Sequence, residues 1–415
     1  MKKNYLLLTV LSSLILSACG GEDTCSCDSN LITPSSTSTQ TTSTNSSTTI
    51  IEDSSSIDYD KEITVTYVLN NGEKDVKRIV YYGDKVAEPG FASKEYYNLE
   101  GWYTDETCTY RRWNFKYDEF TEDTTLYAKW VVDYDEWIWR LARQASKQTI
   151  MLMVTHYKTE SSYTNGNPTS SGVGSGVVIA EEKDPLDNKT YFYALTNNHV
   201  VSYSEEKGGD KNQESMVPTY KDVIEIYDHY NNVYAGELIA TTNTYDLALV
   251  RFQDKIIRNG HWSPNTHDAQ QGIFIATLAD NDPEVGYDVS AYGAPLGQPH
   301  VCTIGNVTQY TNGTISQKPD GVSYITDFEV IEHTADILGG NSGGPLFGVD
   351  LKLVGINYGS SGASDTFTTS DKFWAIPITK VKEFIRTRDN FLKDQKFADR
   401  FEFLDVLAKD TSIAA

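Results

Sequence analysis

Between residues 149 and 356 the chain consists of short apolar runs separated by turn-forming residues. Some runs alternate apolar and polar positions and others are continuously apolar, which is typical of strands with one or both faces buried. We predict strands at 149–157, 173–180, 190–196, 223–228, 247–252, 287–292, 323–331, 346–349 and 353–356. This succession of short strands predicts a double β-barrel and an all-β-dominated fold class.

Three other segments have the apolar spacing of helices. In Tyr134–Lys147, the side chains of Trp137, Leu141 and Ala145 fall on one helical face. Two more helices are predicted near the C-terminus, at residues 379–387 and 391–407. We expect the N- and C-terminal helices to lie around the barrels.

A smaller β pattern precedes this region, at residues 62–131. Residues 63–68 alternate as a strand does, and Asn70-Asn71-Gly72 is a turn signal. Further strand-like runs follow at 78–86, 97–105 and 124–130. We therefore predict a separate β module whose aromatic residues form the core of a small sheet; a ligand-binding platform is the alternative. The aromatic residues are Tyr67, Trp102, Tyr127 and Trp130.

The first 60 residues have the composition of an export signal and a tether. A basic start and an apolar core at 5–16 indicate a secretory signal rather than a spanning helix. Leu16-Ser17-Ala18-Cys19-Gly20 resembles a bacterial lipobox, which implies cleavage before Cys19 and diacylglycerol on its sulfur. The alternative is a secreted protein with an incidental cysteine. Residues 28–60 are mostly Ser and Thr, so we expect 19–61 to be a disordered tether.

Charge and cysteine usage exclude several function classes. The 415-residue chain has a net charge of −23, which disfavours nucleic acid as a partner. After residue 20 no stretch is apolar enough to cross a bilayer. The five cysteines, at 19, 25, 27, 108 and 302, are scattered and lack metal-ligand spacing. We therefore expect no metal and no organic cofactor.

A serine flanked by glycines stands at the centre of the candidate chemistry, in Gly339-Gly340-Asn341-Ser342-Gly343-Gly344-Pro345. Glycines permit a tight turn and a close approach of substrate to the backbone. The amides of Gly340 and Ser342 can then face one point and stabilise an oxyanion. A serine hydroxyl needs a base to accept its proton, so a histidine and a group that orients it are also required.

Two upstream motifs supply these groups. His199 lies in Thr196-Asn197-Asn198-His199-Val200-Val201, and Asp246 directly precedes the apolar run 247–252. The order His, Asp, Ser is that of the chymotrypsin arrangement. The three motifs resemble those of trypsin-like serine peptidases of the HtrA, or Do-like, type. The resemblance implies two six-stranded β-barrels over residues 134–390, with His199, Asp246 and Ser342 as a catalytic triad in the cleft between them.

Each motif also has a simpler interpretation. The serine motif fits the nucleophile elbow of α/β-hydrolases, but that fold needs a histidine after the serine and none follows here. His199 could be a buried structural histidine, and Asp246 could merely cap a strand. Gly174-Ser175-Gly176 opens an apolar strand and is not expected to carry a nucleophile.

The resemblance extends to other parts of the chain, with differences. Residues 62–131 resemble the internalin-type B-repeat, or Listeria–Bacteroides repeat, a small β-grasp-like module of bacterial surface proteins. Residues 372–378 resemble the strand that closes the HtrA protease domain. HtrA proteins usually carry a PDZ domain next, whereas here we expect only a helical tail at 391–415. Asn341 stands where digestive trypsin-like enzymes have an aspartate, so we expect activity without proteolytic trimming.

Substrate preference is less well defined by the sequence. Residues Gly355, Ile356 and Asn357 are predicted to form a wall of the specificity pocket. Asp336, six residues before Ser342, has the spacing of an acid that favours Arg or Lys substrates, and a turn-capping role is the alternative. His333 raises the possibility of an acidic preference, as in glutamyl endopeptidases, but its position does not match theirs.

We therefore predict a lipid-anchored serine endopeptidase on the extracytoplasmic face of a bacterial membrane. Its partners are protein or peptide substrates, the bilayer through acylated Cys19, and a possible cell-surface ligand of the module. The alternative is a catalytically silent surface-binding lipoprotein that works through the module.

Overall fold

The computed structural model describes residues 58–184, 187–207, 210–216, 219–260, 273–315, 324–361 and 372–387. They all belong to the compact unit Asp58–Ala415. The predicted export signal, lipobox and tether and the predicted helix at 391–407 lie outside the described residues. None of the described helices has the length and apolar character that a membrane span requires.

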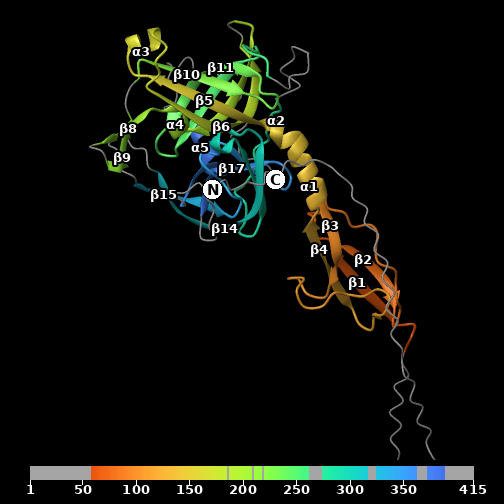
Figure 1. Cartoon of the computed structure of the whole chain (residues 1–415). Coiled ribbons are helices and arrows are strands. Elements are labelled where there is room, and N and C mark those ends of the chain that lie inside the picture. The colour runs from red at the N-terminus through yellow and green to blue at the C-terminus, as the bar shows by residue number, and fades with distance from the viewer. Residues whose placement is uncertain are drawn as a thin grey trace, which may run out of the picture. The chain divides into compact units, whose positions relative to one another are not determined.

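A four-stranded sheet forms the module. Its strands are β1 (Glu62–Val68), β2 (Val76–Tyr81), β3 (Tyr97–Tyr103) and β4 (Thr124–Val132). They are ordered β2-β1-β4-β3, with β1 and β4 parallel and the outer pairs antiparallel. Figure 1 shows them in orange at the start of the described chain. This strand order is the one expected for a β-grasp-like module.

The aromatic core of the module follows the prediction for three of four residues. Trp102 and Tyr67 are fully buried and meet edge to face, with ring centroids 5.1 Å apart. Trp130 packs against the same cluster, and its indole N–H donates to the carbonyl of Leu69 at 2.7 Å. The prediction was wrong for Tyr127, which is half-buried and outside the cluster because it alternates with the buried Leu126 and Ala128 along β4.

One continuous helical segment leads from the module to the barrels. It consists of α1 (Tyr134–Arg140), a π-helical turn η1 (Leu141–Ala145) and α2 (Ser146–Gln148). The Asp133 side chain caps it by accepting the N–H of Glu136. Trp137, Leu141 and Ala145 are all buried, which confirms the predicted apolar face.

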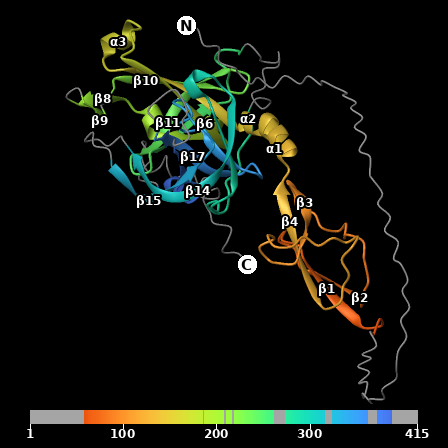
Figure 2. The same cartoon turned by 60° about the horizontal axis from the view of Figure 1, so that its bottom comes forward.

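Two closed six-stranded barrels follow, which confirms the predicted fold class (Figures 1 and 2). The first barrel has the order β10-β11-β12-β7-β6-β5, and the second has the order β13-β14-β15-β18-β17-β16. The first is built from β5 (Thr149–Tyr157), β6 (Ser170–Lys183), β7 (Thr190–Asn197), β10 (Lys221–Tyr227), β11 (Val233–Thr242) and β12 (Leu247–Gln253). The second is built from β13 (Asp288–Gly293), β14 (Val301–Ile315), β15 (Tyr324–His333), β16 (Pro345–Gly348), β17 (Leu353–Ser360) and β18 (Phe373–Pro377).

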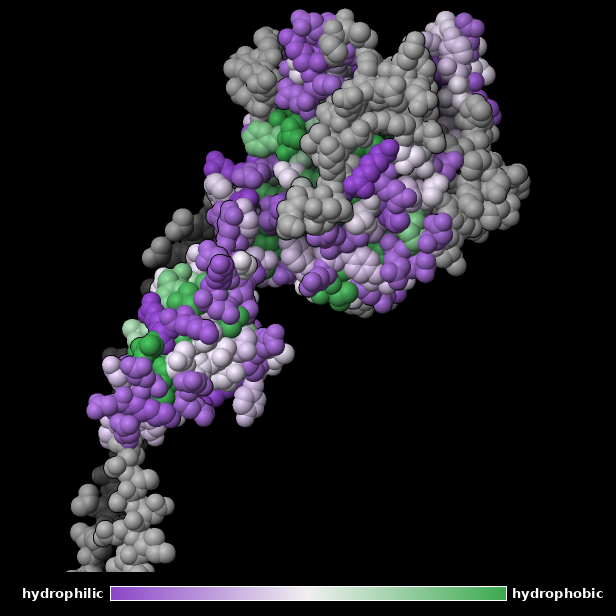
Figure 3. Space-filling view, turned by 180° about the vertical axis from the view of Figure 1, so that it is seen from behind, coloured by the Kyte–Doolittle hydropathy of each residue, from purple (hydrophilic) through white to green (hydrophobic). Residues whose placement is uncertain are grey.

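Short elements connect and cover the barrels. They are α3 (Glu160–Thr164), α4 (Asn198–Val201), η3 (Pro295–Gly297), α5 (Ile378–Arg386) and a hairpin of β8 (Ser204–Lys207) and β9 (Asp210–Met216). Helix α5 was predicted from its spacing, and its buried side chains Val381, Phe384 and Ile385 join the core of the second barrel. Seen from behind, the described surface is mostly hydrophilic, with hydrophobic residues in small separate groups (Figure 3).

Candidate active site

His199 is placed by the end of β7 and the short helix α4. Both valines that follow it, Val200 and Val201, are buried in the core of the first barrel. They hold the helical turn in place and leave the imidazole at the surface of a cleft, with 27% of the side chain exposed.

Asp246 lies next to His199 because their strands are neighbours. It directly precedes β12, whose first residue Leu247 pairs with Asn197 at the end of β7. One carboxylate oxygen lies 2.6 Å from Nδ1 of His199 and the other accepts the His199 backbone N–H at 2.9 Å. The carbonyl of Asp246 accepts the Asn197 side-chain amide at 2.9 Å and the Asn198 N–H at 3.1 Å.

These contacts fix both the position and the chemistry of the imidazole. Asp246 is only 3% exposed, so its charge is largely shielded from water and depends on the hydrogen bonds that it accepts. Because the carboxylate accepts from Nδ1, the second ring nitrogen, Nε2, is the one that can take a proton from a nucleophile. Asp246 has φ = 52°, a left-handed conformation that aspartate tolerates better than most residues.

Ser342 lies in the loop between β15 and β16. Gly343 has φ = 83°, and a Cβ there would lie 2.2 Å from Oγ1 of Thr196. Gly340 has φ = 105°, and a Cβ there would lie 2.4 Å from the carbonyl oxygen of Ala294. The loop therefore requires glycine at both positions to bring Ser342 against the first barrel.

Ser342 and His199 line one cleft of about 340 Å³. Within the described residues Oγ of Ser342 makes no hydrogen bond, so the serine–histidine bond is not formed in this structure. Catalytic hydrogen bonds are often long or poorly aligned without substrate, so this geometry does not argue against a catalytic pair.

Two backbone N–H groups beside Ser342 have no acceptor within the described residues. They belong to Gly340 and to Ser342 itself. Neighbouring carbonyl groups accept hydrogen bonds from elsewhere: that of Gly339 accepts the Leu296 N–H at 2.7 Å. Such a pair of free donors next to a nucleophile can bind an oxyanion.

Ser175 holds this loop in place, a role that the sequence analysis missed. It is fully buried, and its hydroxyl donates to the carbonyl of Gly340 at 2.7 Å and accepts the Ala294 N–H at 2.9 Å. Its backbone N–H donates to the carbonyl of Ser342 at 2.8 Å. The available signal was a serine between two glycines at the start of a buried strand, where a free hydroxyl is costly.

The residues predicted for substrate preference are not part of the cleft lining, although the carbonyl of Asn357 accepts the N–H of Gly343, next to Ser342, at 2.8 Å. Gly355, Ile356 and Asn357 are buried within β17, where they pair with β16 and β18. Asp336 precedes the serine loop, and its carbonyl accepts the hydroxyl of Thr303 at 2.7 Å. None of these four residues lines the cleft that contains Ser342. His333 is 1% exposed at the end of β15, and its burial lowers its pKa to about 4.

Within the described residues no cluster of three or more His, Cys, Asp or Glu side chains has the arrangement of a metal site. Cys108 and Cys302 are free thiols in this part of the chain.

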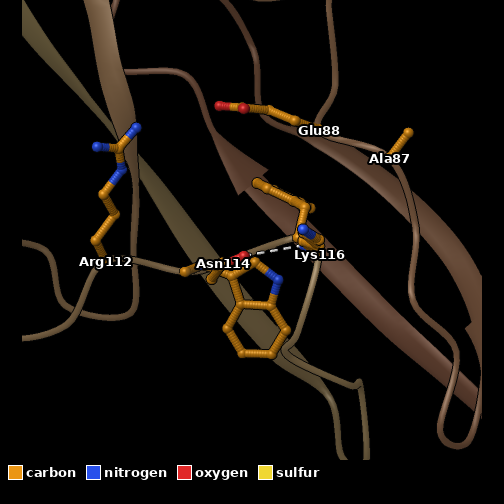
Figure 4. A pocket seen from close by; sticks show the side chains of 7 residues that line it. Ala87, Glu88, Arg112, Asn114 and Lys116 are labelled. Carbon is orange, nitrogen blue, oxygen red and sulfur yellow. Dashed lines mark hydrogen bonds between the residues drawn. The ribbon is translucent and has the colours of Figure 1, made fainter. Parts of the chain in front are cut away.

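The module has a hollow of its own, of about 700 Å³. Its lining carries two cations, Arg112 and Lys116, one carboxylate, Glu88, and the indole of Trp113. Figure 4 shows Arg112 and Glu88 on different chain segments around the hollow, with the Asn114 side chain bonded to the Lys116 backbone. Trp113 is buried, and its N–H has no partner within the described residues.

Comparison with known proteins gives two family matches. Residues 174–356 match the trypsin-like peptidase domain, and residues 64–129 match the Listeria-Bacteroides repeat domain.

Curated relatives match the peptidase part at similar levels. The Do-like serine protease HtrA of Bacillus subtilis is 29% identical over 203 residues, 48% of this chain and 35% of that protein. The glutamyl endopeptidase of Staphylococcus epidermidis is 29% identical over 190 residues, 45% of this chain and 54% of that protein. A probable periplasmic DegP-like serine endoprotease of Marinomonas is 27% identical over 243 residues, 58% of this chain and 40% of that protein. The chain thus spans between a third and about half of these relatives.

Among solved structures, the Rv3671c protease of M. tuberculosis in its active form has a TM-score of 0.38 and 17% identity, over 60% of this chain and 84% of that chain. Deg5 has a TM-score of 0.38 and 21% identity, over 61% and 94%. By these comparisons, residues 174–356 are similar to the trypsin-like peptidase domain, as are the HtrA and DegP-like relatives, and residues 64–129 are similar to the Listeria-Bacteroides repeat domain.

Proposed function

We propose that the chain is a serine endopeptidase in which Ser342, His199 and Asp246 form the catalytic triad. Ser342 attacks a peptide carbonyl while Nε2 of His199 accepts its proton, and the N–H groups of Gly340 and Ser342 stabilise the oxyanion. His199 then protonates the leaving amine, and an acyl-enzyme forms on Ser342. Water, deprotonated by His199, hydrolyses that ester and restores the serine.

The observation that supports this most is the contact between His199 and Asp246. A carboxylate 2.6 Å from Nδ1 selects the tautomer in which Nε2 carries no proton, and Nε2 belongs to a ring that shares a cleft with Ser342. The two unoccupied N–H groups beside Ser342 support the same assignment.

The proposal is tested with a fluorophosphonate probe, which phosphonylates an activated serine. We expect the wild-type chain to be labelled and Ser342→Ala to be inert. Ser171→Ala, an exposed serine of β6 that does not line the cleft, is the matched control and keeps full labelling. Equal labelling of wild type and Ser342→Ala would reject Ser342 as the nucleophile.

The wild-type protein also tests the predictions about activation and substrate preference. We propose that it is active without trimming near residue 134, since Asn341 replaces the aspartate that a new N-terminus would pair with. Activity that appears only after such a cleavage contradicts this.

Asp336 is the candidate for a preference for Arg or Lys before the cleaved bond. A peptide library that shows no such preference rejects this role.

We further propose an extracytoplasmic location with a lipid anchor on Cys19. The lipobox-like sequence supports it, and relatives described as periplasmic agree with export. In bacteria that express the full chain, Cys19→Ser should move the protein from the membrane fraction to the soluble fraction. An unchanged distribution would reject the anchor.

Binding of a surface ligand through the module is the second candidate function. The hollow with Arg112 and Lys116 favours it, because these two cations suit an anionic ligand. Ser342→Ala protein should then bind anionic cell-wall polymer, and Arg112→Ala should weaken binding whereas Lys74→Ala, which lies outside the hollow, should not.

A further inference from the structure

The cleft extends from Ser342 past His199 to a wall made by the first barrel. Besides His199, one part of the lining belongs to the serine loop. The other part belongs to the first barrel and consists of His156, Ser170, Gly172, Val173, Val200, Ser202 and Tyr203. These residues come from the end of β5, the start of β6, helix α4 and the segment after it. The cleft is thus longer than the catalytic groups alone require.

The proposed reaction assigns a direction to this extension. The carbonyl under attack lies at Ser342 with its oxygen toward Gly340, and the leaving nitrogen must face His199, which protonates it. The part of the substrate that follows the cleaved bond therefore runs from His199 toward His156. The wall formed by β5 and β6 contacts the residues of the leaving segment.

His156 is held rigidly in that wall, as a side chain that binds a ligand would be. It is 5% exposed, and its Nδ1 lies 2.8 Å from the carboxylate of Asp222, its cross-strand neighbour on β10. Its ring packs against Tyr203, with centroids 5.4 Å apart. Within the described residues Nε2 has no hydrogen-bond partner, and it is not among the polar atoms sealed from solvent. The imidazole is therefore fixed on one edge and open to the cleft on the other.

The charges around the cleft define the ligand class. Although the whole chain has a net charge of −23, none of the described residues that line the cleft carries a carboxylate. The acids Asp222 and Asp246 lie behind the histidines and accept from their Nδ1 atoms. A carboxylate in the leaving segment would meet Nε2 of His156 and the hydroxyl of Ser170 without a like charge in the lining, whereas a basic side chain would find no acid there.

We propose that His156 is a specificity-determining residue that favours an acidic side chain at the first or second position after the cleaved bond. This inference rests on the proposed function. Asp222 and Tyr203 position the ring. Binding of the substrate carboxylate is coupled to uptake of one proton from solvent by Nε2, which then donates a hydrogen bond to that carboxylate.

The test uses quenched fluorescent peptides that share the residues before the cleaved bond and carry Glu, Gln, Leu or Lys at the two positions after it. We expect the wild-type kcat/KM to be about tenfold higher for Glu than for Leu, the effect of one charge-assisted hydrogen bond. His156→Phe, which keeps the flat ring, should bring the ratio to about one. His156→Gln, which keeps an N–H donor, should retain about a twofold preference. Lys221→Gln, exposed on β10 beside Asp222, is the matched control and should keep the wild-type ratio.

A binding measurement separates this inference from the proposed function. In Ser342→Ala protein, the same peptides should bind about tenfold more tightly with Glu than with Leu, and the difference should vanish when His156→Phe is added. If the fluorophosphonate probe does not label the wild type, the proposed catalysis is wrong. The binding measurement still tests the role of His156, because it requires no catalysis. An equal affinity for Glu and Leu peptides, or a preference for Glu that survives His156→Phe, overturns the inference.

Discussion

The carboxylate of Asp246 bonds to both the ring and the backbone of His199. It therefore does two things: it holds α4 at the end of β7, and it selects the tautomer of the imidazole. An amide in its place could keep most of the first function, but it would donate to Nδ1 and select the wrong tautomer.

We predict that Asp246→Asn keeps the fold and lowers kcat by about 10³- to 10⁴-fold. Circular dichroism reports the fold, and hydrolysis of a peptide substrate reports kcat. Asp222→Asn, which alters the other histidine–carboxylate pair, is the comparison and should lower kcat far less. Equal losses in the two variants would contradict the triad assignment.

Ser175 links the first barrel to the serine loop with one hydroxyl. We predict that Ser175→Ala lowers kcat by about tenfold, and that the lost hydrogen bonds cost about 1–3 kcal/mol of unfolding free energy. The reason is that the Gly340 carbonyl and the Ala294 N–H both lose their partner, so the loop beside the Gly340 N–H, the proposed oxyanion donor, is held less firmly.

Steady-state kinetics and urea unfolding measure the two effects. A purely structural role would lower stability while leaving kcat unchanged, and that outcome would contradict the positioning role. Ser171→Ala, four residues before Ser175 along β6, should change neither quantity.

At the scale of elements, the serine loop depends on glycine more than any other segment near the cleft. We predict that Gly343→Ala destabilises the protein by more than about 2 kcal/mol, because its φ of 83° is unfavourable for alanine and its Cβ would collide with Thr196. Gly339→Ala should stay within about 0.5 kcal/mol of wild type, since nothing lies within 4 Å of a Cβ there. Thermal unfolding of both variants checks this, and a similar stability for the two would contradict it.

Elements with strong apolar patterns were predictable from the sequence. The strand at 247–252 is continuously apolar except for Arg251, and all of these residues are buried in β12. The three buried residues of the helical segment before β5 were predicted in the same way. In both cases the periodicity directly reflects burial on one face or two.

Strands with polar residues, glycines or bulges were not predictable. Strand β14 contains Asn312-Gly313, a turn signal, and the structure has a bulge there instead. Strand β11 contains Gly236 and a bulge between Leu238 and Ala240, so its apolar residues do not keep a period of two. In each case pairing with neighbouring strands overrides the local preference.

The residues of the candidate site also divide into those that the sequence predicts and those that it does not. Motifs with chemistry pointed to His199, Asp246 and Ser342, and the structure brings all three together around one cleft or directly behind it. Ser175 and His156 have no motif that distinguishes them. Their positions depend on how β6 and β5 meet the rest of the barrel, which sequence spacing alone does not describe.

At the scale of the whole molecule, one buried histidine makes stability depend on pH. His333 has a folded pKa of about 4 because burial disfavours its charged form, against an ordinary value of 6.5. The unfolded chain therefore binds a proton more readily. The contribution of this residue is complete above pH 6.5 and is lost as the pH falls from 6.5 to 4, by up to about 3 kcal/mol.

We predict that the unfolding free energy of His333→Gln falls less steeply between pH 6.5 and pH 4 than that of the wild type. Denaturant titrations at several pH values give the slope directly, and the slope is independent of any packing loss at neutral pH. An unchanged slope would show that the pKa of His333 does not differ between the folded and unfolded states.

The serine loop belongs to the second barrel, whereas the imidazole and its carboxylate partner belong to the first. Across this seam Ser175 donates hydrogen bonds to the loop and accepts one from the Ala294 N–H. A displacement of about 1 Å between reacting groups can reduce a rate by about a hundredfold. Both barrels can therefore be fully folded while the molecule is inactive. The rate of hydrolysis would then report how well the two folded barrels are aligned, rather than whether the chain is folded.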